Sequence, residues 1–379
     1  MVIGLLGAGT VGGGVHNLIS GRTDMRIKTI CCLESPEGLS ARLTTRAADL
    51  FEDPEIDVVV EVMGGLHPAR EFVIAAMEAG KHVVTANKLL VAECYEELIR
   101  LAAEKQVAFR CTAAAGGGIP WLTALERCKR VDTITSVSGI MNGTTNYIMD
   151  TMHKQDVSFA DVLGQAQQLG YAEADPSADI DGSDIQNKLV ISANVAFDVL
   201  LKKEDVPVFG IRTVTAEDIA TIKAEGLRCK LLARAARSSG KIAAYVEPTL
   251  VDRERMEAAV PSNYNLISFR GANAGKQSYY GQGAGRYPTA YNVVEDLVDL
   301  SCGVRKFYTT VMRQATVDND MVTHQYYVRT SKKDPWLKKR TVRRWATGVV
   351  TDTVPVGQMH AWARQMLEKD PQLFIAAIR

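Results

Sequence analysis

The first nineteen residues place the strongest constraint on the fold. An apolar run at residues 2–6 leads into the turn GAGTVG at residues 7–12, and an amphipathic stretch continues to residue 19. A short strand, a turn with the spacing GxGxxG and a helix, in this order, are typical of a dinucleotide-binding domain. The glycine spacing alone is a weak signal, but the strand before it and the helix after it make the prediction specific.

Each glycine of this turn has a physical role. Gly7 allows the tight turn, Gly9 lets the backbone approach a pyrophosphate, and Gly12 allows the helix to pack closely on the strand. The helix N-terminus then offers N–H groups and a positive dipole to the phosphates. We therefore expect the turn, including Thr10 and Val11, to bind the cofactor.

The alternation of strand and helix continues as far as residue 111. Apolar runs predict further buried strands at residues 26–33, 57–62, 82–85 and 107–111. Helices are expected at residues 69–79 and 93–105. This order predicts an α/β fold with a Rossmann-type doubly wound parallel sheet. Because a chain of 379 residues exceeds the size of one hydrophobic core, at least a second domain should follow.

Several residues follow these strands at the edge where ligands bind in such sheets. Glu34 closes the second strand, where an acidic side chain binds the adenosine ribose and repels a 2′-phosphate, so NAD is favoured over NADP. Arg42 nearby leaves NADP open. Gly64 would let a ligand approach the backbone, and Asn87 and Lys88 would lie beside the nicotinamide. The alternatives are that Gly64 only forms a tight turn and that Lys88 is a surface lysine at the start of a helix.

A second group of reactive side chains lies at residues 170–189. Asp184 and Lys188 are four residues apart, so a helix opening near Gly182 would place them on one face. Four more carboxylates precede them in a loop broken by proline and glycine: Glu173, Asp175, Asp179 and Asp181. Such a loop suits a small cationic, hydroxylated ligand. A solvated surface pair is the alternative, although the apolar continuation LVISANVAF favours a buried helix.

Composition limits the partners. Lysine and arginine balance aspartate and glutamate, and no basic block is interleaved with aromatic residues, so a small-molecule substrate is expected and nucleic acid is not. No stretch approaches an uncharged membrane span, so no membrane association is expected. The N-terminal run lacks a basic leader and is expected to form a strand. Seven scattered cysteines fit neither a disulfide framework nor a CxxC metal pattern, which indicates a reducing cytoplasm.

A set of motifs, in the same order along the chain, resembles those of the homoserine dehydrogenase family. They cover residues 1–303 and read GLLGAGTVGGGV, VVTANKLLVA, AAAGGGIPWL, GIMNGTTNYI, GYAEADPSADIDGSDIQNKL, DIATIKAEGLRCKLLARA and GQGAGRYPTAYNVVEDL. The resemblance implies an oxidoreductase that interconverts L-homoserine and L-aspartate 4-semialdehyde with NAD or NADP. This reaction belongs to the biosynthesis of threonine and methionine.

The resemblance also implies roles for individual residues. Lys188 falls on the proton donor and acceptor, and Asp184 and Glu173 fall on the residues that bind the substrate's amino group and hydroxyl. Lys88 resembles the catalytic lysine beside cofactor and substrate, and Gly285 resembles a glycine that approaches the cofactor. Three further positions match residues near the substrate: Thr144, Tyr171 and Asp179.

One departure from the family pattern concerns a metal. Some family members hold a monovalent cation through backbone carbonyls, which would here lie near Thr112, Ala115, Gly117 and Ile119. Thr112 replaces the usual acidic residue before GGGIP, which counts against this ion. We therefore assign no metal and keep these positions only as a candidate backbone site.

Two other functions compete with this interpretation. A semialdehyde dehydrogenase that forms a thioester would need a nucleophilic cysteine, and no cysteine lies in a convincing context. A catalytically inactive, nicotinamide-binding sensor of amino-acid status would keep the fold and lose the chemistry. The presence of Lys88, Glu173, Asp184 and Lys188 argues against that sensor.

The resemblance divides the chain into three parts. Residues 1–130 would form the dinucleotide-binding domain, completed by residues 286–310, and residues 131–285 an α+β catalytic and dimerisation domain. The family pairs two subunits through this second domain, so a homodimer is expected. Residues 317–379 resemble a short ACT-like tail, a βαββαβ module. The tail could sense threonine or serve only in packing, and its basic run at residues 332–344 is expected to be a solvated face.

Overall fold

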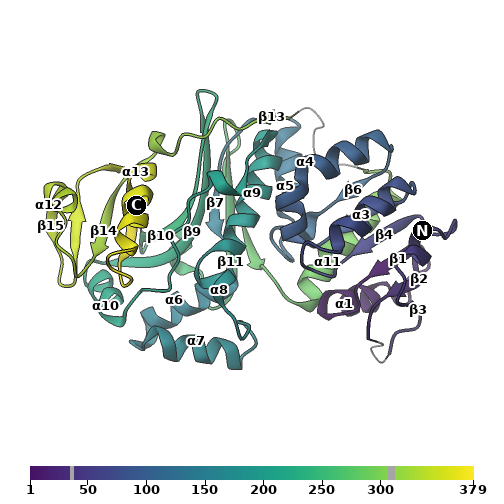
Figure 1. Cartoon of the computed structure of the whole chain (residues 1–379), viewed down its shortest axis with the longest axis horizontal. Coiled ribbons are helices and arrows are strands. Elements are labelled where there is room, and N and C mark those ends of the chain that lie inside the picture. Colours follow the sequence, from purple (N-terminus) through teal and green to yellow (C-terminus); the bar gives the residue numbers. More distant parts are fainter. Residues whose placement is uncertain (35–37, 306–311) are drawn as a thin grey trace. The chain divides into compact units, whose positions relative to one another are not determined.

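The computed structural model describes residues 1–34, 38–305 and 312–379, and the chain divides into two compact units (Figure 1). The first unit comprises Met1–Thr133, Val190–Lys202 and Gly281–Gln314. The second unit comprises Ile134–Leu189, Lys203–Tyr280 and Ala315–Arg379. The finer division into three ranges remains a prediction. Residues 306–310 of the expected returning segment, and residues 35–37 of the segment that follows Glu34, lie outside the described residues.

A parallel sheet forms the centre of the first unit. Its strands are β1 (Val2–Leu6), β2 (Arg26–Cys31), β3 (Arg42–Thr44), β4 (Val58–Glu61), β5 (His82–Thr85) and β6 (Phe109–Arg110). They lie in the order β3-β2-β1-β4-β5-β6, with every neighbouring pair parallel. This order reverses direction at β1, as in dinucleotide-binding sheets, so the predicted Rossmann-type doubly wound sheet is confirmed.

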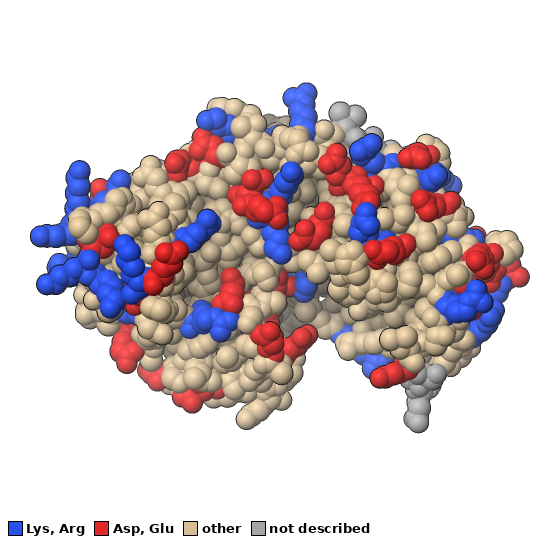
Figure 2. All heavy atoms as spheres, viewed as in Figure 1, with Lys and Arg blue, Asp and Glu red and all other residues tan. Residues whose placement is uncertain are grey.

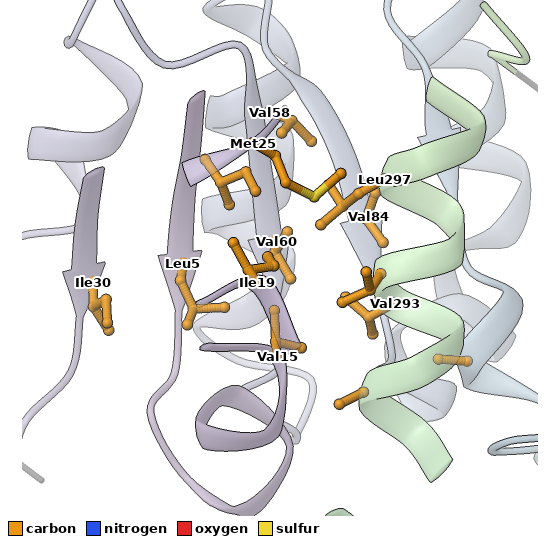
Figure 3. Close-up of a cluster of buried hydrophobic side chains, with 14 residues drawn as sticks. Leu5, Val15, Ile19, Met25, Ile30, Val58, Val60, Val84, Val293 and Leu297 are labelled. Atoms are coloured by element: carbon orange, nitrogen blue, oxygen red, sulfur yellow. The ribbon is translucent and has the colours of Figure 1, made fainter. Parts of the chain in front are cut away.

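The helices of the first unit come from distant parts of the chain. They are α1 (Thr10–Ile19), α2 (Ala48–Phe51), α3 (Ala69–Glu78), α4 (Lys88–Glu104), α5 (Trp121–Lys129) and α11 (Arg286–Ser301). Figure 3 shows Val293 and Leu297 of α11 directed toward Val60 and Val84 of the sheet, and all four side chains are fully buried. Burial of each such side chain stabilises the folded state by about 1.5–3 kcal/mol. Apolar packing therefore fixes α11 to the N-terminal sheet.

The first unit differs from the sequence prediction in two elements. Strand β3 was not expected, because Arg42–Thr44 is short and mostly exposed. Helix α4 begins at Lys88 rather than at residue 93. The Asn87 side chain accepts a hydrogen bond from Leu90 N at 3.1 Å and so caps the helix, which then bends at Cys94. The periodic pattern had indicated only the part beyond this bend. A short parallel pair, β8 (Val199–Leu200) with β13 (Arg313–Gln314), completes the unit.

A long mixed sheet forms the second unit. Its strands are β7 (Ile134–Ile140), β9 (Leu227–Ser238), β10 (Lys241–Asp252), β11 (Tyr264–Gly271), β12 (Gly275–Gln282), β14 (Thr323–Arg329), β15 (Thr341–Arg344), β16 (Val349–Thr351) and β18 (Phe374–Ile378). The order is β12-β11-β7-β9-β10-β18-β14-β16-β15, and β17 (Val354–Pro355) pairs with β14. Most neighbours are antiparallel, and β10 with β18 is parallel. The predicted α+β character of this region is confirmed.

The helices of this unit include those that carry the second group of reactive side chains. They are α6 (Gly143–Gln155), α7 (Phe159–Gln168), α8 (Ser177–Ile180), α9 (Ser183–Phe197), α10 (Ala216–Ala224), α12 (Pro335–Arg340) and α13 (Val356–Leu367), and α9 continues into the first unit. Helix α6 is tied to β9, since His153 Nε2 accepts a hydrogen bond from Cys229 N at 2.9 Å. Burial lowers the pKa of His153 to about 3, so this imidazole is neutral and acts as an acceptor.

The last segment of the chain extends this sheet. Its order is strand, helix, two strands, the short β17, helix and strand, and its likeness to an ACT module remains a prediction. Strand β18 joins it to β10, with Thr249 opposite Ala377. The basic run, which was expected to be a solvated face, is largely exposed and forms the helix α12 and the edge strand β15. Among the described residues, we find no helix with the length and hydropathy of a membrane span.

Candidate active site

The glycine turn of the first unit has the geometry of a phosphate-binding turn. Gly7 has φ 99°, a conformation that favours glycine, and its N–H donates to Cys31 O at 2.9 Å. A Cβ at Gly12 would lie 2.2 Å from Gly7 O, so only glycine fits there, whereas a Cβ at Gly9 would meet no atom within 4 Å. Gly9 precedes the first residue of α1, Thr10, and the first turn of α1 with Val11 contains no acidic side chain. Its N–H groups therefore suit an anion.

Arg286 lies beside this turn, although it is far away in the sequence. A Cβ built on Gly13 would be 2.6 Å from an Arg286 guanidinium nitrogen, and one built on Gly14 would be 2.7 Å from Arg286 O. Gly285, the residue before α11, has φ 122° and so lets the chain turn into this helix. The structure thus adds a cation near the turn, and sequence reasoning had singled out only the neighbouring Gly285.

The ends of β4 and β5 are held together by a buried carboxylate. Glu61 is inaccessible to solvent and accepts hydrogen bonds from Met63 N at 2.8 Å, Thr85 Oγ1 at 2.5 Å and Asn87 Nδ2 at 3.4 Å. Burial raises the pKa of Glu61, against the lowering effect of these donors. Asn87 Nδ2 also donates to Gly65 O at 2.6 Å. Asn87 therefore shapes the sheet edge and caps α4, and Glu61 is a site residue that sequence reasoning missed.

Other residues expected at the cofactor lie at the same edge of the sheet. Lys88 is the first residue of α4 and is exposed, and Gly64 has φ 79° in the turn after β4. Glu34 is exposed beyond the end of β2. Arg42, the alternative contact for a 2′-phosphate, lies instead at the start of β3, opposite Thr29 of β2, with 66% of its side chain exposed and 3.5 Å from Asp49. The acidic candidate for the cofactor's ribose therefore follows the carboxyl end of β2, and the basic candidate lies at the start of β3.

Protein hydrogen bonds reach part of the candidate backbone cation site. Asn292 Nδ2 donates to the carbonyl oxygens of both Gly117 and Ile119, the latter at 2.9 Å. Thr112 donates through N and Oγ1 to Asp296, at 2.9 and 2.7 Å. Ala115 is buried beside them. One amide group therefore binds two of the four candidate carbonyls, whose oxygens each have a second lone pair. Among the described residues, no group of three or more His, Cys, Asp and Glu side chains could hold a metal ion.

The second unit brings Asp184 and Lys188 together as predicted from their spacing. Lys188 Nζ lies 2.7 Å from Asp184 Oδ2 and 2.8 Å from Met141 O. Lys188 is 7% exposed and Asp184 3% exposed, so this pair is not a solvated surface pair. A buried ammonium group in this position combines positive charge with exchangeable protons, which suits a group that donates a proton to an oxygen.

Asn142 connects this pair to a second carboxylate. Its Nδ2 donates to Asp184 Oδ2 at 2.9 Å and to Asp179 Oδ1 at 2.5 Å, and its Oδ1 caps α6 by accepting from Thr145 N at 2.8 Å. Burial has the largest effect on Asp179 and raises its pKa, and the negative charge of Asp184 raises it further. The hydrogen bond from Asn142 lowers this pKa. Sequence reasoning missed Asn142, although an Asn directly before the helix GTTNYI is a recognisable cap.

The other residues predicted to bind the substrate differ in their contacts and exposure. Thr144 Oγ1 donates to Tyr171 O at 2.5 Å, which ties the start of α6 to the loop. The Tyr171 ring packs edge-on against Tyr147, with 5.2 Å between centroids. Glu173 is exposed in the loop, and Gln167 donates to its backbone oxygen at 3.1 Å. The structure therefore places Glu173 on the loop surface rather than in the buried cluster.

Two acidic residues of the same loop have structural partners. Asp175 accepts from Ser177 N at 3.0 Å, and Asp181 forms an exposed pair with Arg212 at 2.7 Å. The hydrogen bonds from Ser177 lower the pKa of Asp175. These contacts order the turn around α8 and leave two carboxylates for the cluster, Asp184, which is buried, and Asp179, which is half-buried.

Comparison with known proteins identifies the family. A model of the homoserine dehydrogenase NAD-binding domain matches residues 7–111, and a homoserine dehydrogenase model matches residues 120–298. The homoserine dehydrogenase of Bacillus subtilis is 39% identical over 317 residues, which cover 80% of this chain and 73% of the relative. The chain belongs to the homoserine dehydrogenase family. The homoserine dehydrogenase of Synechocystis is also 39% identical, over 87% of this chain and 79% of that protein.

Solved homoserine dehydrogenase structures share the fold. The enzyme from Thiobacillus denitrificans superposes with a TM-score of 0.90 and 33% identity, over 100% of this chain and 98% of that chain. As a homoserine dehydrogenase, the chain is an oxidoreductase that uses NAD or NADP, which confirms the predicted cofactor class.

Proposed function

We propose that this chain interconverts L-homoserine and L-aspartate 4-semialdehyde with NAD or NADP, in the biosynthesis of threonine and methionine. Family membership supports the reaction, and the observation that carries its chemistry is the buried Asp184–Lys188 pair. The glycine turn fits the cofactor's pyrophosphate, because the space at Gly9 is open and Arg286 adds positive charge. When bound, the nicotinamide supplies or accepts the hydride.

In this proposal Lys188 moves the proton. In the reducing direction its Nζ donates a proton to the aldehyde oxygen, which becomes the homoserine hydroxyl, and in the oxidising direction Nζ takes the proton back. Asp184 and Met141 O orient the ammonium group from 2.7 and 2.8 Å. The positive charge also stabilises the negative charge that develops on the substrate oxygen. Lys88, at the sheet edge of the first unit, is proposed as the second catalytic lysine beside cofactor and substrate.

The substrate's polar groups would be held by residues of the second unit. Glu173 and Asp184 are proposed to bind the amino group and hydroxyl, and the residues that shape the pocket around them are Thr144, Tyr171 and Asp179. Glu173 is exposed, so it remains accessible to a substrate ammonium group. Its proposed contribution is therefore to binding more than to proton transfer.

A substitution at Lys188 tests the proton transfer. Lys188→Ala should lower kcat by about 10²–10⁴-fold, while the dissociation constant of the nicotinamide cofactor stays near that of the unmodified enzyme. Lys154→Ala is a matched control, because Lys154 and Asp150 have the same spacing and the same 2.7 Å distance but a 54% exposed lysine. Rates are followed near 340 nm, roughly the maximum of the reduced nicotinamide. Turnover retained by Lys188→Ala would remove this residue from the role.

The same assay with other variants tests substrate binding and the inactive-sensor alternative. Glu173→Leu should raise the KM for homoserine strongly, and Asp175→Leu in the same loop should not, because Ser177 already satisfies Asp175. An unchanged KM in Glu173→Leu would exclude its assignment. Absence of turnover with both NAD and NADP would favour a sensor that binds the cofactor without reaction.

The choice between NAD and NADP is proposed from Glu34. Its exposed carboxylate at the end of β2 favours the ribose hydroxyl of NAD, so kcat/KM should be higher with NAD. Glu34→Gln should raise the relative kcat/KM for NADP. A wild-type preference for NADP that Arg42→Gln abolishes would assign the phosphate contact to Arg42 instead.

We also infer a homodimer in the cytoplasm. Strand β12 is a sheet edge with partly exposed residues, and Tyr280, which stacks on Tyr264 at 5.1 Å, is 54% exposed. Such an edge with exposed aromatic residues suits pairing with a second subunit. All seven cysteines are free thiols, which supports a reducing compartment. Light scattering coupled to gel filtration measures the subunit number, and a monomeric mass would contradict the dimer.

A further inference from the structure

A basic cavity lies in the last segment of the chain, within the second unit and apart from the Asp184–Lys188 cluster in sequence. It has a volume of about 850 Å³ and lies between the loop after β14, α12 and the β15–β16 turn. Its charged lining is dominated by cations: Lys332, Lys333, Lys338 and Arg344. This volume is typical of small-molecule sites.

The charge in this region is strongly one-sided. Residues 332–344 include seven lysine and arginine residues and one acidic residue, Asp334, in a chain whose formal charge is zero. Figure 2 shows lysine and arginine side chains gathered at the left of the view, over α12 and β15 in Figure 1. Asp334 offsets only one of the four cationic charges in the lining, and its Oδ1 is held by Leu337 N at 2.9 Å and Trp362 Nε1 at 3.1 Å.

The cations that line the cavity lack carboxylate partners among the described residues. Arg340 and Arg343, which do not line it, pair with Asp352 at 3.3 Å and Glu225 at 3.8 Å. Within the described ranges, no corresponding ion pair involves Lys338 or Arg344, and both are exposed. Several like charges around one cavity repel each other, so an anion bound there would relieve this repulsion.

The cavity wall also contains an unsatisfied donor. Trp345 is 8% exposed, lines the cavity and stacks on Tyr327 at 5.4 Å, and its Nε1 has no hydrogen-bond partner among the residues that the structure describes. A buried indole N–H usually has an acceptor. Leu337 and Val349 add an apolar part to the lining, which suits a ligand with carbon atoms as well as charge.

We propose that this cavity binds a small organic anion with at least two negative charges, a phosphate ester or a polycarboxylate. Lysine and arginine bind the charged oxygens, and the apolar wall beside Trp345 receives the carbon skeleton. A concave site of this size argues against nucleic acid, which requires an extended positive surface.

Two related probes distinguish the forms of anion. Phenyl phosphate and phthalate both carry an aromatic ring and negative charge, and benzyl alcohol is the uncharged control. The full-length protein labelled with ¹⁵N-tryptophan gives indole signals from its four tryptophans, which are assigned by Trp→Phe substitutions. At constant ionic strength, at least one of the two anions should shift the Trp345 signal saturably, and benzyl alcohol should not.

Paired variants separate a built site from general surface charge. The double variant Lys338→Gln, Arg344→Gln should weaken anion binding by about tenfold or more, because it removes two charge-assisted contacts. The double variant Lys339→Gln, Lys369→Gln removes the same charge outside the cavity and should change affinity less than about twofold.

Three results would overturn the proposal. The first is the absence of a saturable Trp345 shift with both anions. The second is that the two double variants weaken anion binding equally. The third is that a single-stranded oligonucleotide binds more tightly than the two anions and that both double variants weaken its binding equally. The last result would assign a nucleic-acid surface. Because binding is measured without turnover, failure here leaves the proposed dehydrogenase reaction untouched.

Discussion

Replacing Asn142 with serine tests whether one amide group organises the catalytic cluster. Serine retains an oxygen that can cap α6 through Thr145 N, but it lacks the amide that donates to Asp179 and Asp184. The substitution therefore removes the bridge between the carboxylates of Asp179 and Asp184 and preserves the helix start. With the bridge gone, Asp184 is less firmly placed against Lys188.

The magnitude follows from the two lost hydrogen bonds. A hydrogen bond to a charged group contributes about 1.5–3 kcal/mol, so the unfolding free energy should fall by roughly 3–6 kcal/mol, or less if water replaces the amide. The Asn142 bond lowers the pKa of Asp179, so its loss raises that pKa further. Loss of about 1.4 kcal/mol corresponds to about one pKa unit. Displacement of Lys188 should also lower kcat, by up to about 10²-fold.

The assay is kcat/KM for homoserine measured from pH 5 to 9, together with urea unfolding. We expect the acidic limb of the profile to move upward by about one pH unit in Asn142→Ser. Asn146→Ser is the control, because Asn146 lies on the same helix and donates to Ser262 O at 2.7 Å and Tyr264 O at 3.2 Å, away from the cluster. It should lose stability and keep the wild-type profile. A folded Asn142→Ser enzyme with unchanged kcat and an unmoved acidic limb would refute the reasoning.

Three further predictions concern the cofactor turn and pH. Gly12→Ala should raise the cofactor dissociation constant at least about tenfold, because its Cβ would lie 2.2 Å from Gly7 O. Gly164→Ala is the control, because a Cβ there meets open space and should leave the dissociation constant unchanged. Equal affinities of the two variants in fluorescence titrations would contradict this prediction. Arg286→Gln should weaken cofactor binding and its salt dependence, measured by titration at two ionic strengths, and an unchanged salt dependence would exclude the phosphate contact. Burial lowers the pKa of His153 to about 3. Below about pH 6.5 the unfolded chain therefore binds a proton at this residue that the folded chain does not. As the pH is lowered from 6.5 to 5, the unfolding free energy should fall by roughly 2 kcal/mol. His153→Gln should remove this part of the dependence in urea unfolding, and an identical pH dependence would show that other groups cause it.

Local sequence patterns predicted the parts of this protein that depend on neighbouring residues. The turn at Gly7 and Gly12 is readable because its backbone geometry excludes other residues there. The Asp184–Lys188 pair is readable because a helix brings residues four apart onto one face. The alternation of apolar strands and helices likewise indicated the parallel sheet. Short, exposed elements such as β3 and β15 lack such a pattern and were missed.

Only the tertiary structure revealed the groups that position these residues. Arg286 lies against the first turn of α1, Glu61 holds the ends of β4 and β5 together, and Asn142 joins two carboxylates that lie 37 and 42 residues further along the chain. No periodicity encodes such contacts, because they arise when separate elements pack and each buried polar group needs a partner. The amino-acid sequence therefore determined which groups can react, and packing decided which groups hold them in place.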